Sequence, residues 1–141
     1  KRTMRSSVDL SALLGDVAGA ARRAGATVEV DSPAGLTLNL RPDAARRALT
    51  NLVDNARRHA GHVHLSAVTQ DRAVQVLVDD DGPGIPPDRR ESVFRAFESG
   101  EGGGTGLGLT IARDIVRAHG GDIVLERSPM GGLRARLRLP V

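Results

Sequence analysis

The sequence of 141 residues contains no cysteine, tryptophan or tyrosine and only two phenylalanines. The lack of cysteine excludes disulfide bonds, cysteine metal ligands and thiol catalysis. No stretch approaches the roughly 20 apolar residues that a transmembrane helix requires, and the first residues do not resemble a signal peptide. We therefore expect a domain in an aqueous compartment that makes no membrane contact of its own.

Lysine is also scarce, since Lys1 is the only one. A Walker A loop needs Gly-Lys-Ser/Thr and is excluded, as is the strand lysine of eukaryotic-type protein kinases. No Gly-x-Gly-x-x-Gly follows a strand, which excludes a Rossmann site. The net charge of +3 comes almost entirely from arginines spread along the chain. This distribution is typical of a solvated surface, so we expect no nucleic-acid partner.

The length and composition, with 40% hydrophobic and 26% charged residues, are those of one globular domain. Residues 1–7 are polar and basic and are interpreted as a linker. Residues 8–141 are interpreted as the domain itself. Because the chain begins at Lys1 instead of Met, we expect a segment upstream.

Three segments have apolar residues at the three- and four-residue steps of amphipathic helices, namely residues 8–24, 42 to about 60, and 107–119. Alternation of apolar and polar residues predicts three hairpins, which join 27–30 to 36–40 as an edge ribbon, 62–69 to 73–79, and 123–126 to 133–139. The pattern predicts an α/β two-layer sandwich. Its mixed, largely antiparallel sheet would have about five strands plus the small edge ribbon, with three helices on one face.

Residues 82–106 are rich in glycine, proline and charge and predict a long loop with one short helix. A loop of this length in a compact domain is usually functional. Its end, residues 102–109, reads Gly-Gly-Gly-Thr-Gly-Leu-Gly-Leu and leads into the third predicted helix. Glycine lets the backbone approach an anion, and the first N–H groups of a helix point toward it. Taken alone, the run is equally consistent with a flexible loop and a helix cap.

Asp80 stands at the end of a predicted strand and opens the segment Asp-Asp-Gly-Pro-Gly-Ile. Its carboxylate can accept a hydrogen bond from the exocyclic amine of adenine, where guanine carries a carbonyl. Asp80 would therefore select adenine over guanine. The alternative is an ordinary Asp-Gly turn, which is common.

Asn51 and Asn55 are four residues apart and share one face of the second predicted helix. Asparagine is unfavourable in mid-helix, and its amide oxygen can bind a hard cation such as Mg²⁺, so the pair suggests a polar cleft. Two solvent-facing amides are the alternative. One turn later, Arg58 can reach a terminal phosphate and His59 can stack on a base, although both are also ordinary residues at a helix end.

Together and in this order, the segments resemble the GHKL ATPases, and within them the ATP-binding catalytic domain of bacterial two-component sensor histidine kinases. The similar segments are residues 51–56 (N box), 80–85 (first glycine box), 94–97 (F box) and 104–109 (second glycine box). The flanks agree as well, so the resemblance covers nearly the whole chain. It implies the Bergerat ATP-binding fold, with ATP and Mg²⁺ as cofactors.

The resemblance also implies roles for individual residues. Asn55 would ligate Mg²⁺ directly, Arg58 would contact phosphate, and both would act in phosphoryl transfer. Phe94 and Phe97 would anchor an ATP lid over about residues 86–106. The implied nucleotide contacts are Asn51, Asn55, Arg58, His59, Asp80, Gly82, Gly84, Ile85, Gly104, Thr105, Gly106, Leu107 and Gly108.

The activity implied is donation of the γ-phosphoryl group of ATP to a histidine on the dimerisation domain of the parent kinase, with a response regulator downstream. The four histidines, His59, His62, His64 and His119, lie in no helical His-acid motif, so the acceptor is expected outside this chain. The resemblance implies that residues 1–7 link the domain to an upstream helical dimerisation and phosphoacceptor domain. The domain would be cytoplasmic in a membrane-bound parent. Two alternatives are a stand-alone GHKL protein-serine kinase of the anti-sigma type and a non-catalytic nucleotide-sensing module.

Two departures from the family pattern stand out. Residues 98–101 read Glu-Ser-Gly-Glu, where relatives often place a basic residue near the phosphates. Leu133 and Ala135 stand where relatives more often have a hydroxyl residue and a larger apolar one. We expect the second departure to affect packing more than chemistry.

Overall fold

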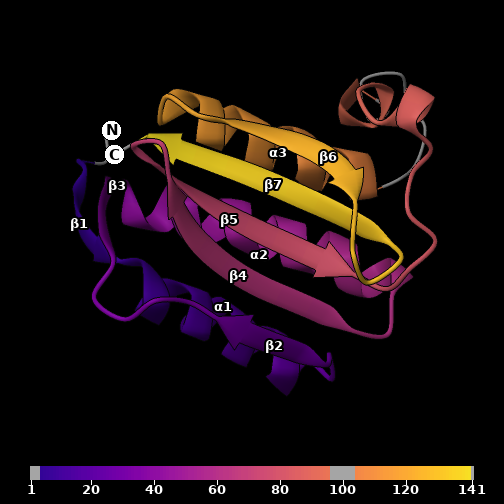
Figure 1. The fold of residues 1–141 in the computed structure, drawn as a ribbon, viewed down its shortest axis with the longest axis horizontal. Helices are drawn as coiled ribbons and strands as arrows, with labels where there is room; N and C mark the ends of the chain where they lie inside the picture. The colour runs from indigo at the N-terminus through magenta and orange to yellow at the C-terminus, as the bar shows by residue number, and fades with distance from the viewer. Residues whose placement is uncertain (1–3, 96–103, 141) are drawn as a thin grey trace.

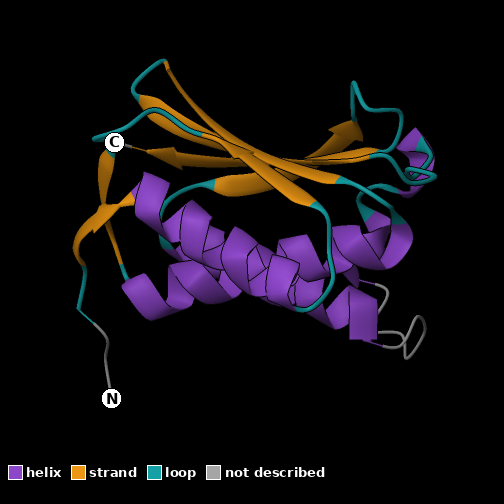
Figure 2. Cartoon of the chain, turned by 90° about the horizontal axis from the view of Figure 1, so that it is seen from below, coloured by secondary structure: helices purple, strands orange, loops and turns teal. Residues whose placement is uncertain are grey.

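The computed structural model describes residues 4–95 and 104–140. They form two layers, with the helices α1 (Leu10–Arg23), α2 (Pro42–His59) and α3 (Gly104–Ala118) on one face of a sheet. Figure 2 shows that the other face of the sheet is left open. The α/β two-layer sandwich predicted from the sequence is confirmed.

The main sheet has five strands in the order β2-β4-β5-β7-β6. Their bounds are β2 Val28–Asp31, β4 Val63–Gln70, β5 Ala73–Asp80, β6 Asp122–Arg127 and β7 Leu133–Pro140. Only β2 runs parallel to its neighbour β4, and every other pairing is antiparallel. The sheet is therefore mixed and largely antiparallel, as predicted.

Two of the three predicted hairpins are correct. The β4–β5 hairpin turns at Asp71 and Arg72, whose φ angles of 53° and 58° suit the tight two-residue turns of hairpins. The β6–β7 hairpin also forms. The hairpin predicted to join residues 27–30 to 36–40 is wrong. Strand β2 pairs with β4, and β3 (Thr37–Leu40) pairs with β1 (Ser6–Asp9). Turn residues between two short strands predicted a hairpin, but each strand gains more from a distant partner.

The edge ribbon thus exists with different strands. Ser6 and Ser7, which the sequence placed in a linker, belong to β1 and face Leu40 and Asn39 of β3. Helix α1 begins directly afterwards, and the carboxylate of Asp9 caps it by accepting from the backbone N–H of Ala12 at 3.2 Å. The predicted start of this helix at Val8 was therefore two residues early.

Helix α2 matches its prediction and α3 begins three residues earlier than predicted, at Gly104. Pro42 occupies the first turn of α2, where its missing N–H costs nothing. In the described part of the segment between β5 and α3, residues 81–95, two 3₁₀-helices stand where one short helix was expected, η1 (Pro87–Arg89) and η2 (Ser92–Arg95). Among the helices of residues 4–95 and 104–140, none combines the length and the apolar character needed to cross a bilayer.

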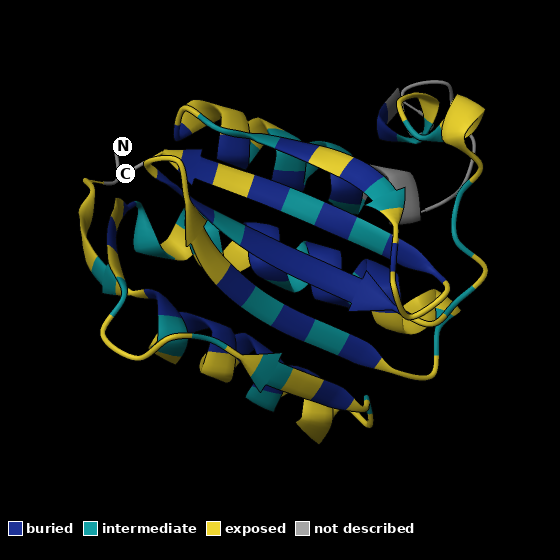
Figure 3. Cartoon of the chain, viewed as in Figure 1, coloured by how far each residue is buried: buried dark blue, intermediate teal, exposed yellow. Residues whose placement is uncertain are grey.

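The hydrophobic core lies between the two layers. Strand β5 is buried along most of its length, as Figure 3 shows, and its inward residues Val74, Val76 and Val78 pack toward the helices. Leu52 and Val53 of α2 are almost fully buried on the facing side. Helix α2 packs against both α1 and α3 and is the central helix of its layer, as β5 is the central strand of the sheet. Their carboxyl-terminal ends carry the residues singled out from the sequence.

Candidate functional site

The predicted site residues gather at one end of the molecule. Figure 1 shows the ends of β5 and α2, the start of α3 and the β6–β7 turn at this end, while the marked N and C termini lie at the other. Asp80 closes β5, Asn55 lies in the last turns of α2, and Gly104 opens α3. Residues far apart in the sequence thus meet around one edge of the sheet.

Asp80 is a buried carboxylate, with 4% of its surface exposed. Its Oδ1 accepts backbone N–H groups from Gly82 at 2.9 Å and from Leu133 at 3.0 Å. Its backbone oxygen accepts from the N–H of Gly132 at 3.1 Å. Within the described part of the chain, Oδ2 accepts no hydrogen bond. One oxygen therefore fixes the carboxylate, and the other can accept a hydrogen bond from a ligand.

Two glycines make this arrangement possible. A Cβ on Gly82 would lie 2.5 Å from the backbone oxygen of His59, and one on Gly132 would lie 2.2 Å from Oδ1 of Asp80. Gly84 has a φ of +73°, which a side chain rarely tolerates. Gly132 was missed as a site residue, because the sequence marked it only as part of a hairpin turn.

Asp81 ties the loop after α2 to this turn and was also missed. Its Oδ1 accepts the backbone N–H groups of Gly61 and His62 at 2.9 and 3.0 Å, and its Oδ2 lies 2.8 Å from Nδ1 of His62. The hydrogen bonds from His62 hold the pKa of Asp81 below its usual value. The end of α2 and the turn after β5 are therefore one connected unit.

The two asparagines of α2 differ in their surroundings. Asn51 donates from Nδ2 to the backbone oxygen of Gly108 at 3.3 Å, which ties α2 to α3. Asn55 is buried at 9% exposure, and its Oδ1 has no hydrogen-bond partner among the described residues. A buried acceptor without a partner costs about 1 to 3 kcal/mol, so native proteins seldom leave one without a reason. An oxygen-seeking cation would satisfy it.

Arg58 and His59 are exposed at the end of α2. In the ranges that the structure describes, neither side chain has a hydrogen-bond or ion-pair partner. Both can therefore move toward a ligand. The backbone of Gly104 to Gly108 forms the first turn of α3, where N–H groups have no partner within the helix. The positive end of the helix dipole lies there and favours an anion.

A cavity of about 310 Å³ lies beside the turn after Asp80. This volume is in the range of small-molecule sites. Gly84, Ile85, Arg127 and Gly132 are among the residues that line it. The residues that line this cavity do not include Asn51, Asn55 or Arg58. Residues 96–103 and the side chains of 104–107, which include Phe97, Thr105 and Leu107, lie outside the described residues.

Phe94 is buried at 4% exposure, as expected of an anchor for the loop. Leu133 and Ala135 are buried too, which agrees with a role in packing. Metal ligation by acidic or histidine clusters finds no support, because the described residues contain no group of three or more His, Cys, Asp or Glu placed to hold an ion.

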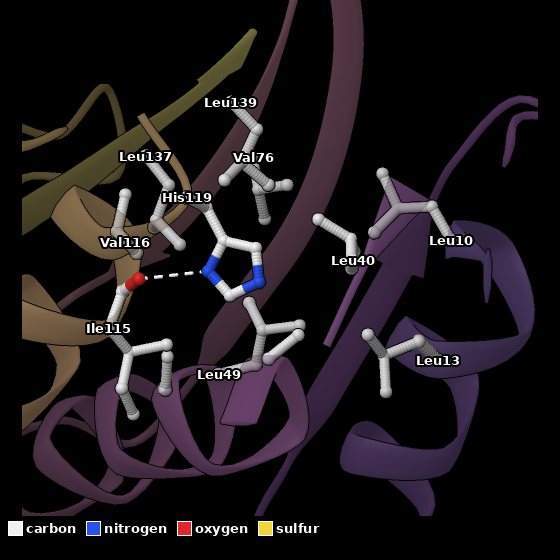
Figure 4. Close-up of a pocket in the computed structure, with 12 residues that line it drawn as sticks. Leu10, Leu13, Leu40, Leu49, Val76, Ile115, Val116, His119, Leu137 and Leu139 are labelled. Carbon is white, nitrogen blue, oxygen red and sulfur yellow. Dashed lines mark hydrogen bonds between the residues drawn. The ribbon is translucent and has the colours of Figure 1, made fainter. Parts of the chain in front are cut away.

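His119 is structural. Figure 4 shows its ring among leucine and valine side chains at the end of α3 away from the glycine-rich start. Its Nε2 accepts the backbone N–H of Arg41 at 3.0 Å, so Nδ1 carries the proton and donates to the oxygen of Ile115 at 2.8 Å. The small cavity around it, about 20 Å³, is far too small for a nucleotide. His119 thus joins the end of α3 to the start of α2.

Comparison with known proteins agrees with this geometry. Residues 40–141 match the family described as histidine kinase-, DNA gyrase B- and HSP90-like ATPase. The sensor histidine kinase GtrS of Pseudomonas aeruginosa is 43% identical over 136 residues, which are 95% of this chain and 28% of GtrS. The chain spans about a third or less of the curated relatives it matches, from 28 to 32% of their length.

Solved structures show the same fold. The ATP binding domain of PrrB from Mycobacterium tuberculosis has a TM-score of 0.82 and 37% identity, and the match covers 96% of each chain. Full-length ShkA in complex with AMPPNP has a TM-score of 0.84 and 28% identity, over 99% of this chain and 32% of that one. The chain therefore belongs to the histidine kinase-, DNA gyrase B- and HSP90-like ATPase family, as an ATP-binding domain of the bacterial sensor histidine kinase type.

Proposed function

We propose that this domain binds Mg-ATP and donates its γ-phosphoryl group to a histidine on the dimerisation domain of the same parent protein, in two-component signalling. The observation that carries the proposal is the pairing of two buried acceptors at one end of the molecule. Asp80 has one carboxylate oxygen without a partner among the described residues, and Asn55 has an amide oxygen without any.

Asp80 is suited to recognise the base. Because Oδ1 is fixed by two backbone N–H groups, Oδ2 is held in one orientation and can accept the exocyclic amine of adenine. Guanine would place a carbonyl oxygen against the carboxylate, and neither group could donate. Gly82, Gly84 and Ile85 would line the base beside it.

Asn55 and the start of α3 are suited to the triphosphate. Asn55 would ligate Mg²⁺ through Oδ1, and Asn51 would line the same face of α2. The ion would neutralise phosphate charge when bound, which phosphoryl transfer requires. The backbone N–H groups of residues 104–108 would bind the phosphates, and Arg58 would approach the terminal one from the end of α2. His59 would stack at the base.

The acceptor histidine would lie on the parent's dimerisation domain, and a response regulator would then take the phosphoryl group. Both partners follow from the sensor kinases that the chain resembles, of which it spans about a third or less. Within this chain, His119 is buried with both ring nitrogens engaged, which makes it unsuitable as an acceptor. We place the domain on the cytoplasmic side of a membrane-bound parent.

The test is calorimetric titration of the domain with ATP, ADP and GTP, with and without Mg²⁺, for the wild type and Asp80→Asn. Asn keeps an oxygen for the N–H groups of Gly82 and Leu133 but turns an amine toward the base. We expect the variant to fold with a somewhat lower melting temperature, because the two N–H groups lose a charged acceptor, and we expect a loss of ATP affinity of about 10- to 100-fold with a smaller loss for GTP. Normal ATP affinity in the variant, or equal wild-type affinity for GTP, would sink the assignment.

Transfer itself is tested with the full-length parent protein. Radiolabel from γ-labelled ATP should appear on a histidine, as an acid-labile and base-stable product, and should disappear in Asp80→Asn. Label on a serine would favour the anti-sigma type of kinase. ATP binding with no label on any residue would favour a nucleotide-sensing module.

A further inference from the structure

Arg113 lies at a junction of three parts of the chain. Its guanidinium bonds both carboxylate oxygens of Glu91, from Nη1 at 3.0 Å and from Nη2 at 3.2 Å. Its Nε donates to Oδ1 of Asp122 at 3.0 Å, and its Cζ stands 4.1 Å from the centroid of the Phe94 ring. The Arg113 side chain is only 11% exposed. One side chain of α3 therefore holds the segment before η2, η2 itself and the start of β6.

A second contact holds the same segment. The hydroxyl of Thr110, on α3, donates to the backbone oxygen of Phe94. Phe94 is buried, so its ring and its backbone are both fixed against one helix. Residues 91–94 are thus attached to α3 by an ion pair, a cation–π contact and a hydrogen bond.

This helix is also the proposed phosphate element. Its first turn begins at Gly104, about 13 Å along the helix from Arg113 at 1.5 Å per residue. Asn51 fixes the same end of the helix to α2 through Gly108. Since a helix of this length moves nearly as a rigid rod, contacts at residues 108 and 113 together determine the direction in which its first N–H groups point.

We propose that Arg113 is a positioning residue of the nucleotide site, which sets the placement of α3, and of residues 91–94 upon it, for binding of the phosphates. The inference rests on the proposed function. Arg113 itself touches no group assigned to the nucleotide. It acts through the helix that carries the phosphate-binding N–H groups.

Charge keeps the junction assembled. Hydrogen bonds from Arg113 hold the pKa of Glu91 below its usual value, so this carboxylate stays ionised at neutral pH. Burial lowers the pKa of Arg113, but its bonds to Glu91 and Asp122 outweigh that and raise it. The Glu91 side chain is 64% exposed, and such a pair contributes little to global stability. The main contribution of the Arg113–Glu91 pair is therefore to hold residues 91–94 in place on α3.

Arg117 offers a matched control. It bonds the same carboxylate, with Nε at 3.0 Å from Oδ1 and Nη2 at 3.3 Å from Oδ2 of Asp122. In the described residues it has no bond to Glu91 and no contact with the Phe94 ring. Replacing Arg117 thus removes another arginine of α3 that bonds Asp122, but it leaves the contacts of residues 91–94 in place.

The experiment measures the affinity of Mg-ATP and of adenosine for wild type, Arg113→Ala, Arg117→Ala and Glu91→Gln, with melting temperatures. We expect Arg113→Ala to weaken Mg-ATP binding about five- to tenfold and adenosine binding less than about twofold. Arg117→Ala should leave both within about twofold. We expect Glu91→Gln to keep the fold and to weaken Mg-ATP binding by about half as much as Arg113→Ala does, measured as the change in the logarithm of the affinity. This variant keeps the test possible if Arg113→Ala fails to fold.

Equal losses for adenosine and Mg-ATP in Arg113→Ala, equal effects of Arg113→Ala and Arg117→Ala, or unchanged Mg-ATP affinity in both Arg113→Ala and Glu91→Gln would each overturn the inference. Failure of the wild type to bind Mg-ATP is a different result. It would overturn the proposed function, and this inference with it.

Discussion

The turn after β5 and the junction around Arg113 are built in opposite ways. At the turn, a buried carboxylate accepts backbone N–H groups, and two glycines leave no space for a side chain. At the junction, an arginine joins carboxylates that are 64% and 44% exposed. The first is fixed by steric exclusion and the second by charge.

In the proposed nucleotide site, the turn carries Asp80 on the side of the base, and the junction positions the helix that would bind the phosphates. Hydrogen bonds to a buried charge are worth about 1.5 to 3 kcal/mol each, whereas exposed ion pairs contribute about 0 to 1 kcal/mol and weaken with salt. The turn should therefore tolerate no added side-chain atoms at its glycines. Substitutions at the junction should be tolerated, with graded changes in affinity. Three further experiments test this contrast.

The largest effect is expected for Gly132→Ala. The new Cβ would lie 2.2 Å from Oδ1 of Asp80 and 2.5 Å from the backbone nitrogen of Gly82, so the backbone must move. We expect a loss of unfolding free energy of about 2 to 4 kcal/mol, measured by urea denaturation, together with loss of ATP binding.

Gly15→Ala is the matched control. Gly15 lies in α1 with no atom within 4 Å of its added Cβ, and alanine is the better helix former by about 1 kcal/mol. The same exchange should therefore stabilise the protein there. A Gly132→Ala variant as stable as the wild type would show that the turn is not sterically fixed.

Asn55→Ala should change stability and affinity in opposite directions. The exchange removes a buried acceptor without a partner and improves helix propensity, so the unfolding free energy of the ligand-free domain should rise by about 0.5 to 1 kcal/mol. Mg-ATP affinity should fall, while adenosine affinity should stay within about twofold. Calorimetry with and without Mg²⁺ checks this. Equal losses for metal-free ADP and for Mg-ATP would argue against Asn55 as the Mg²⁺ ligand.

The smallest effect is expected at Asp122. Burial raises its pKa, but hydrogen bonds from Arg117 and Arg113 outweigh this and lower the pKa from 3.8 to about 2. Because the folded pKa is depressed, the stabilisation is present above about pH 4 and is lost as pH falls toward 2. Wild type should exceed Asp122→Asn in unfolding free energy near neutrality by less than about 1 kcal/mol, and the gap should close below pH 3. A gap that persists at pH 2 would contradict this origin.

Much of the fold follows from local pattern. The apolar stripe of α2 and the alternation of β4 and β5 predict these elements because each pattern is repeated over several turns or residue pairs. The partner of β2 could not be predicted, since β4 lies more than 30 residues further along the chain and four residues carry little pairing information. The same limit applies to β1, whose partner β3 lies beyond an entire helix.

Single residues of unusual type and position could be picked out from the sequence. Asp80 and Asn55 are two of these, and the structure buries both, while their roles in the site stay predictions. Gly132, Asp81 and Arg113 were missed because their importance depends on neighbours from other elements. Gly132, for example, meets a carboxylate 52 positions earlier in the sequence. An arginine in a helix is an ordinary surface residue until its partners are known.

The β1–β3 ribbon has a mechanical consequence. A force applied at Met4 would load the four residue pairs of this ribbon before any contact of the main sheet. Most of β1 is exposed, so the ribbon should separate at low force. Figure 1 places the proposed nucleotide-binding end of the molecule away from both termini, so separation of the ribbon would leave the turn after β5 in place. The four pairs of the ribbon would thus be a mechanically weak element that can open without loss of the main sheet.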